Sequence, residues 1–177
     1  MIWYISRMKK FIVSIITMVL LTSAYSADYY YSLDDEYHCM ALNIYHEARS
    51  DNLAGKIAVA DVVLNRVNDS RYPDTICGVV YDAKMSTWHK QEGRDVPLRN
   101  RCQFSWFCDG LSDEPKSGVS WNEAKHIAKQ FLDNGEYRGI TEGATHYHAT
   151  YVKPYWVTGK GMHMIGQIGE HIFYRWK

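Results

Sequence analysis

The sequence predicts an α+β protein in which helices come first and a short antiparallel sheet comes late. Apolar residues recur at helical spacing in three segments between positions 33 and 132. After position 143, short runs rich in β-branched and aromatic residues lie between glycines, which is typical of strands. The chain has 177 residues, which suits a single compact domain at roughly 100–200 residues per domain.

The composition argues against several classes of protein. Hydrophobic residues make up 46% and charged residues 23% of the chain, which is ordinary globular usage and argues against disorder, collagen and coiled coil. The formal net charge is zero, so no broad electrostatic field favours nucleic acid, and we expect no nucleic-acid partner. Aromatic residues make up 14%, and the flat, amphipathic faces of Tyr and Trp favour a planar or saccharide ligand.

The N-terminus has the pattern of an export signal. Basic residues precede a short apolar run at 11–22, and Ala24 and Ser26 supply the small residues of a cleavage site. We therefore predict a signal peptide at 1–26 and a mature domain at 27–177, in a protein exported to the periplasm or the cell exterior. A buried N-terminal helix and an uncleaved membrane anchor are the alternatives, and only an uncleaved signal would bring the chain to a membrane.

Export makes disulfides the default for the four cysteines, which are Cys39, Cys77, Cys102 and Cys108. No pair has C-x-x-C spacing, which argues against a zinc ribbon or a thioredoxin-like site. Cys102 and Cys108 are close enough to close a short loop, which leaves Cys39 with Cys77. Four cysteines allow three connectivities, however, and the sequence alone does not choose among them.

Two helices are predicted at the start of the mature domain. Ser32 is a suitable N-cap, and apolar residues at helical spacing predict an amphipathic helix from Leu33 to about Arg49. Polar residues at 50–52 end this helix and cap the next one. The segment 53–67 is apolar nearly all round, so we expect a second helix that is buried at the centre of the domain.

The rest of the chain is predicted to hold two more helices, a loop and the strands. Thr75 caps a short helix that ends at Val80, and residues 84–101 form a polar loop of the kind that serves as a lid or binding loop. Ser120 and Glu123 form a capping box for the next helix. This helix is predicted at 121–132, and the strand regions are predicted at 144–150 and 164–176.

Glu47 is the first candidate for catalysis. At 100° per residue it lies about 60° from the centre of the apolar stripe of its helix. His46 and Arg49 lie on the opposite side by the same count. A carboxylate on the rim of a buried face is partly desolvated, which raises its pKa and suits a general acid. The alternative interpretation is a structural ion pair with Arg66 or another base.

Histidines are the second candidate. His146 and His148 lie on one face of a predicted strand, which is an arrangement that zinc ligands use, so a metallohydrolase is an alternative. Ser50 stands where the helical zinc-protease motif would need a histidine, so that motif is absent and we expect no metal and no cofactor. Ser105 lacks the flanking glycines of a nucleophile elbow.

Five segments follow one another over nearly all of the predicted mature domain: Ala41–Arg49, Ala58–Val67, Tyr72–Tyr81, Cys102–Trp106 and the late run from His146 to Tyr174. Together they resemble the cell-wall hydrolases of the spore cortex-lytic (SleB/CwlJ) type. The resemblance implies a small lysozyme-like domain that cleaves peptidoglycan between N-acetylmuramic acid and N-acetylglucosamine, with Glu47 as the catalytic acid. The chain departs from the family at Ser50-Asp51, where Gly-Glu is usual, so a role for Asp51 stays open.

The number of catalytic carboxylates separates two reactions. Hydrolysis with two carboxylates needs a second acid, and the sequence does not distinguish among Asp51, Asp61, Asp109 and Glu142. Lytic transglycosylation needs only Glu47, which protonates the glycosidic oxygen and then, as a base, helps the muramic 6-hydroxyl close a 1,6-anhydro ring. The resemblance implies this reaction, and we favour it.

The candidates for binding the N-acetyl groups are Tyr45, Gln103, Ser105, His146 and His148. We expect the protein to act as a monomer on peptidoglycan glycan strands. A zinc-dependent cell-wall amidase or peptidase and a non-catalytic wall-binding domain are the alternative functions. A bacterial remodelling enzyme and a phage lysis enzyme would share the same sequence pattern.

Overall fold

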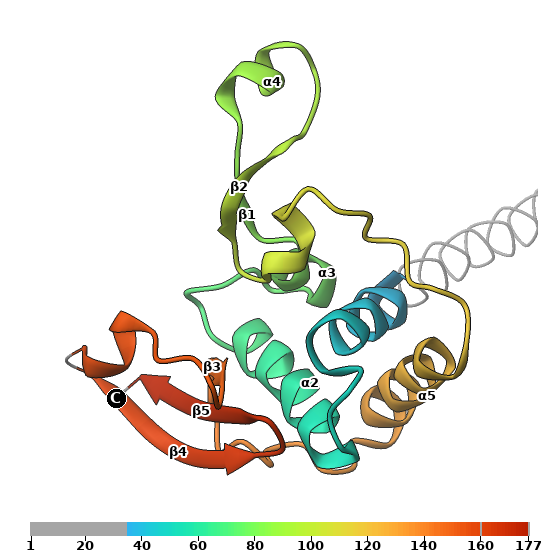
Figure 1. Cartoon of the computed structure of the whole chain (residues 1–177), viewed down its shortest axis with the longest axis vertical. Coiled ribbons are helices and arrows are strands. Elements are labelled where there is room, and N and C mark those ends of the chain that lie inside the picture. Colours follow the sequence, from blue (N-terminus) through green and yellow to red (C-terminus); the bar gives the residue numbers. More distant parts are fainter. Residues whose placement is uncertain (1–34, 160, 177) are drawn as a thin grey trace, which may run out of the picture. The chain divides into compact units, whose positions relative to one another are not determined.

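The computed structural model describes residues 35–159 and 161–176. The predicted signal peptide at 1–26 and the predicted N-cap Ser32 lie outside the described residues. Within the described ranges, no helix is both long and apolar enough to cross a bilayer. Figure 1 shows the order of the elements, with helices early and a sheet at the end, as the sequence predicts.

Two consecutive helices form the centre of the described domain. The first covers residues 35–48, and α2 covers Leu53–Val67. Asn52 caps α2, because its side-chain oxygen accepts a hydrogen bond from the backbone N–H of Gly55 at 2.9 Å. Most residues of α2 are buried, on all of its sides. The two helices predicted here are confirmed, and so is the central burial of the second.

α5 (Val119–Asn134) packs against α2 on the side away from the sheet (Figure 1). The capping box predicted for it is wrong. Gly118 is the N-cap residue, and no side chain caps the helix. Glu123 instead accepts a hydrogen bond from the Nζ atom of Lys56 at 2.8 Å, so it pairs with a cation of α2 rather than with the start of its own helix.

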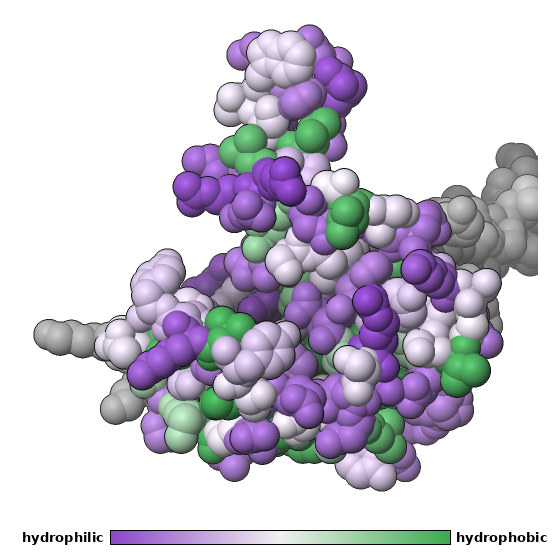
Figure 2. Space-filling model, viewed as in Figure 1, coloured by the Kyte–Doolittle hydropathy of each residue, from purple (hydrophilic) through white to green (hydrophobic). Residues whose placement is uncertain are grey.

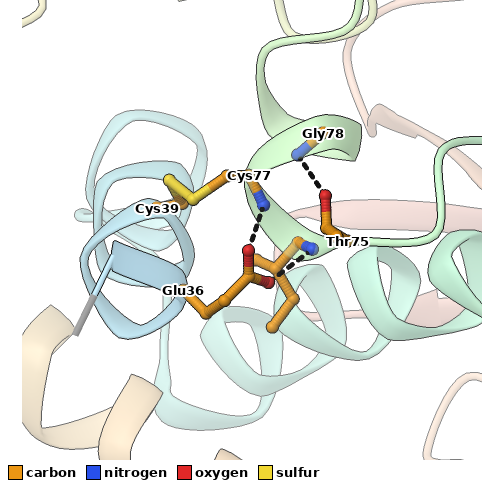
Figure 3. Close-up of a disulfide and its surroundings, with 6 residues drawn as sticks. Glu36, Cys39, Thr75, Cys77 and Gly78 are labelled. Atoms are coloured by element: carbon orange, nitrogen blue, oxygen red, sulfur yellow. Dashed lines mark hydrogen bonds between the residues drawn. A yellow bond between two sulfur atoms is a disulfide. The ribbon is translucent and has the colours of Figure 1, made fainter. Parts of the chain in front are cut away.

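The short helix α3 (Ile76–Val80) is held against the first helix by a disulfide and a carboxylate (Figure 3). The disulfide joins Cys39 to Cys77. Glu36 accepts hydrogen bonds from the first two backbone N–H groups of α3, at 2.6 and 3.4 Å. A negative charge is favourable at this end of a helix. Thr75 caps α3 through its hydroxyl, as predicted.

Residues 83–102 form an arm that projects from the helices (Figure 1). Its elements are β1 (Ala83–Met85), α4 (Thr87–Gln91) and β2 (Pro97–Cys102), and the two strands pair antiparallel. The prediction of a loop without structure at 84–101 is therefore wrong. Four of the six residues of β2 are exposed, so the strand carries no alternating apolar pattern that could have revealed it. Figure 2 shows hydrophilic side chains over most of the arm.

A second disulfide closes the base of the arm. It joins Cys102, at the end of β2, to Cys108, at the end of the 3₁₀ helix η1 (Ser105–Cys108). The two disulfides are the pairs that the spacing of the cysteines favoured. The described residues hold no free cysteine.

The late sheet has the order β3-β5-β4, with antiparallel pairing throughout. Its strands are β3 (His146–Ala149), β4 (Met162–Ile168) and β5 (His171–Trp176), and the 3₁₀ helix η2 (Tyr155–Thr158) lies between β3 and β4. Phe173 points inward and packs with Ala144 against Ala58 and Val62 of α2. α2 therefore lies between the sheet and α5 (Figure 1).

Candidate active site

A cleft of about 690 Å³ opens where three segments of the chain meet. They are the last turn of the first helix, the segment that begins at η1, and β3 with the loop after it. Glu47 lines this cleft, together with three of the residues predicted to bind substrate, Tyr45, Ser105 and His148. The other two predicted binding residues, Gln103 and His146, do not line it. The cleft therefore gathers most of the predicted site.

Glu47 is a partly buried carboxyl group with an altered acidity. Burial raises the pKa of Glu47 above its ordinary value of 4.5. Two neighbours act in the opposite direction and lower it. Tyr147 donates a hydrogen bond from its hydroxyl to the Oε2 atom of Glu47 at 3.0 Å, and the positive charge of Arg66 acts from farther away. The net shift is upward, which is the shift that a general acid needs near neutral pH.

Tyr147 supports Glu47 from the inner face of β3. Its ring lies against His171 and Phe173, with centroids 5.1 and 5.6 Å away. Burial and the nearby charge of Glu47 raise the pKa of Tyr147 well above its ordinary value. The hydroxyl therefore keeps its proton and acts as a donor to the carboxylate. The sequence did not predict Tyr147 as a site residue, although Tyr147 lies between the predicted site residues His146 and His148.

Arg66 of α2 is a buried cation behind the site. Its Nε atom donates to the carbonyl oxygen of Thr145 at 2.8 Å, and its guanidinium lies over the rings of Tyr72 and Phe104. Burial lowers its pKa, while the negative charge that can form on Tyr147, Tyr72 and Glu47 raises it. Among the described residues, Arg66 and Glu47 are not within ion-pair distance, so the structural ion pair considered from the sequence is not formed.

His46 and Arg49 line the same cleft as Glu47, although the helical wheel puts them on the side of the helix opposite its apolar stripe. The segment after η1 wraps around this end of the helix and makes its outer side a cleft wall. His46 stacks on Trp106 with centroids 4.6 Å apart, and its Nε2 atom lies 3.0 Å from the carbonyl oxygen of Asp113. A helical wheel cannot show such a covering segment.

The candidates for a second acid lie in three different surroundings. Asp51 and Asp61 are buried, and each accepts three hydrogen bonds from other described residues, which marks them as structural. Glu142 is exposed and lies outside the cleft. Asp109 lines the cleft, and so does Glu114, which sequence reasoning did not consider.

The two late histidines lie side by side on the outer face of β3. Burial, with smaller effects of Arg66 and Arg71, lowers the pKa of His146 to about 4, so its ring is neutral near pH 7. His148 reaches the cleft, whereas His146 packs against Trp156 with centroids 5.5 Å apart. In the described part of the chain, no three His, Cys, Asp or Glu side chains are grouped so that they could hold a metal ion.

The chain is similar to known proteins of the cell wall. A family model described as cell wall hydrolase matches residues 50–174. Spore cortex-lytic enzyme of Oceanobacillus iheyensis is 44% identical over 48 residues, which are 27% of this chain and 17% of that protein. The enzyme of the same name from Halalkalibacterium halodurans is 41% identical over 49 residues, 28% of this chain and 15% of that protein. The match spans less than a fifth of either relative.

The fold has a counterpart among solved structures. The crystal structure of the catalytic domain of the Bacillus cereus SleB protein matches with a TM-score of 0.50 and 24% identity, over 80% of this chain and 91% of that one. This likeness confirms the expected lysozyme-like α+β fold. The family model begins three residues after Glu47 and covers more than half of the chain, including α2, η1 and most of the late sheet. The chain belongs to the cell wall hydrolase family.

Proposed function

We propose that this protein degrades peptidoglycan by cleaving the bond between N-acetylmuramic acid and N-acetylglucosamine, as a lytic transglycosylase with Glu47 as general acid and base. The observation that carries the proposal is the partly buried Glu47 carboxyl in a cleft, with a raised pKa and a hydrogen bond from Tyr147. Membership of the cell wall hydrolase family supports the substrate class. The printed names of the relatives, spore cortex-lytic enzymes, support it as well.

The environment of Glu47 suits both halves of this reaction. Protonated Glu47 gives its proton to the glycosidic oxygen as the bond to C1 of the muramic residue breaks. The carboxylate then takes the proton of the 6-hydroxyl, whose oxygen attacks C1 and closes the 1,6-anhydro ring. Burial favours the protonated form for the first step, while Tyr147 and Arg66 stabilise the carboxylate for the second. Glu47 ends protonated, and no water is consumed.

The cleft holds two other acids that a mechanism with two carboxyl groups could use. Asp109 and Glu114 line the cleft with Glu47. The shift in the pKa of Glu47 comes from burial, from the hydrogen bond of Tyr147 and from the charge of Arg66. Variants of the two other acids therefore test whether the reaction needs Glu47 alone. Three further cleft residues, Tyr45, Ser105 and His148, are our candidates for contacts with N-acetyl groups.

Product analysis tests the proposal directly. Purified peptidoglycan treated with the protein should release muropeptides that end in anhydromuramic acid, which mass spectrometry finds one water lighter than reducing ends. Glu47→Gln should lower turnover by roughly 10²–10⁴-fold, because it removes the proton donor and keeps the shape. Glu114→Gln is the matched control and should stay active. Reducing ends as the sole products, or an equal loss with Asp109→Asn, would instead establish a hydrolase with two carboxylates.

Chelator treatment separates this proposal from a zinc-dependent amidase or peptidase. Proton transfer through Glu47 needs no metal ion, so activity on purified peptidoglycan should survive prolonged incubation with EDTA. Loss of activity with EDTA and its return with zinc would favour the metal-dependent alternative. Released amino groups, measured in the same samples, would then show that peptide bonds or amide links are cut instead of glycan strands.

A further inference from the structure

The outer face of the late sheet carries aromatic side chains. In the register of the strands, His146 of β3 lies opposite Tyr174 of β5, which lies opposite Met164 of β4. Successive side chains of a strand point to opposite faces. Because Tyr147 and Phe173 point inward, to Glu47 and to the core, these three side chains point outward. The sheet therefore presents a second surface, and these three side chains lie outside the cleft.

Four rings on this side form a continuous path, which we call the aromatic strip: His148, Trp156, His146 and Trp176. The centroid of Trp156 lies 5.7 Å from that of His148 and 5.5 Å from that of His146. The centroid of His146 lies 5.6 Å from that of Trp176. Trp156 comes from η2, so the path is built from the sheet and from the turn that lies against it.

One end of the aromatic strip is part of the cleft. His148 lines the cleft, and so does Tyr151, whose side chain is 86% exposed just after β3. The other end is Trp176, which is 40% exposed and has the guanidinium of Arg71 5.8 Å from its ring. A polymer that leaves the cleft beside His148 therefore meets the aromatic strip next.

The aromatic strip has hydrogen-bonding edges, and His146 within it is uncharged near pH 7. His146 is neutral, because burial lowers its pKa to about 4. The Nδ1 atom of His148 lies 2.9 Å from a backbone carbonyl oxygen, that of Ala149, which can only accept a hydrogen bond. This nitrogen therefore carries a proton, and Nε2 lies 3.1 Å from the hydroxyl of Tyr174. Flat apolar faces with polar edges suit an uncharged, hydroxyl-rich polymer.

We propose that the aromatic strip holds the glycan strand beyond the cleft and supplies extra sugar-binding subsites that make the protein prefer long strands to short fragments. The inference rests on the proposed function for the identity of the polymer. It also gives a role to His146, which the sequence indicated as a substrate contact and which the structure places outside the cleft. Trp156 and Trp176, rather than charged groups, carry the binding.

The test replaces Trp176, whose exposed ring is the least needed for folding. Activity is measured on long, peptide-free glycan strands and on a tetrasaccharide of the same sugars. Trp176→Ala should lower the ratio of kcat/KM on strands to kcat/KM on the tetrasaccharide by roughly three- to tenfold, mostly through KM, as expected for the loss of one aromatic contact. Trp176→Tyr should restore most of the ratio. Trp88→Ala, which removes an exposed indole from the arm, is the control and should keep the ratio of the unchanged protein.

A binding measurement separates failure of this inference from failure of the proposed function. Glu47→Gln protein is incubated with insoluble peptidoglycan, and the bound fraction is compared with that of Glu47→Gln/Trp176→Ala. Weaker binding of the double variant supports the aromatic strip even if the products show that the reaction is a different one. An unchanged kcat/KM ratio together with unchanged binding would overturn the inference. So would equal losses on both substrates accompanied by a lower melting temperature, since these indicate a role in folding alone.

Discussion

Glu47 and Asp51 lie one helical turn apart in the sequence, at the junction of the first helix and α2, but the structure surrounds their carboxylates differently. Asp51 accepts hydrogen bonds from the backbone N–H groups of Asn52 and Glu170 and from the Nδ1 atom of His171, at 2.7–3.2 Å. Glu47 accepts one hydrogen bond from a described residue, Tyr147, and faces the cleft.

The comparison teaches how one short segment can hold a structural acid beside a reactive one. The backbone at Gly55 and Gly169 approaches Asp51 so closely that an added Cβ atom would lie 2.1 and 2.3 Å from its carboxylate. This packing fixes Asp51 between α2 and the β4–β5 turn. Glu47 has fewer donors around its carboxylate, so burial dominates and raises its pKa. The number of donors, more than the type of residue, decides what each acid can do.

The largest expected effect is a loss of stability when Asp51 loses its carboxylate. Asp51→Ala leaves two backbone N–H groups and an imidazole without their acceptor, and each buried donor left unpaired costs about 1–3 kcal/mol. Urea unfolding should therefore show a free energy of unfolding lower by at least about 2 kcal/mol. Asp74→Ala is the control, because Asp74 is exposed, and it should unfold like the unchanged protein.

Activity of the same variant tests whether the comparison is correct. Asp51→Ala protein that is still folded, assayed well below its melting temperature, should keep most of its turnover on peptidoglycan. A variant that unfolds like the unchanged protein and yet has no activity would make Asp51 a second catalytic acid. The structural role assigned to its three hydrogen bonds would then be wrong.

A smaller effect of opposite sign is expected for the stability of Glu47→Gln. The pKa of Glu47 is raised in the folded protein above 4.5, so the folded state binds more protons than the unfolded chain between 4.5 and the raised value. The stability that this group contributes is complete below pH 4.5 and is lost as the pH rises through the folded-state pKa. Glutamine has no charge to bury and suffers no such loss.

Glu47→Gln should therefore be more stable than the unchanged protein at pH 7 to 8, by about 1.4 kcal/mol for each pH unit by which the pKa of Glu47 is raised. The difference in melting temperature should shrink to nothing below pH 4.5. Thermal unfolding at a series of pH values measures it, with Glu114→Gln as the control. A Glu47→Gln protein that is less stable at pH 8 would mean that the carboxylate is satisfied as fully as that of Asp51.

The sequence predicted the helical part of the fold well, because strong local signals specify it. The apolar pattern at 53–67 and the caps Asn52 and Thr75 are local features, and they decide where α2 and α3 begin. The arm at 83–102 was missed because its strands are mostly exposed and pair only with each other. Nothing in an exposed ribbon of polar residues separates it from a loop.

The site could be predicted only in part, because its key contacts join distant segments. Glu47 was found from its place on one helix. Its partner Tyr147 is 100 residues away, and only the register of β3 against β5 turns that side chain inward. Asp51 stayed ambiguous for a similar reason, since two of its three donors come from the turn near Glu170, about 120 residues later. Long-range register, which the sequence pattern does not specify, therefore decided the role of each acid.

The smallest expected effect concerns the hydrogen bond that distinguishes Glu47 from an acid held by burial alone. Tyr147→Phe removes a donor that lowers the pKa of Glu47, so this pKa should rise further. The alkaline limb of the pH profile of kcat/KM should then move to higher pH, by up to about one unit, because one hydrogen bond is worth about 0.5–1.5 kcal/mol.

Tyr72→Phe, which keeps the ring under the guanidinium of Arg66, is the matched control and should leave the limb in place. A limb that stays in place or moves to lower pH would show that Tyr147 does not act through Glu47. If Tyr147→Phe instead lowered kcat at every pH without moving the limb, its hydroxyl would contact the substrate, and the contrast between Glu47 and Asp51 would rest on burial alone.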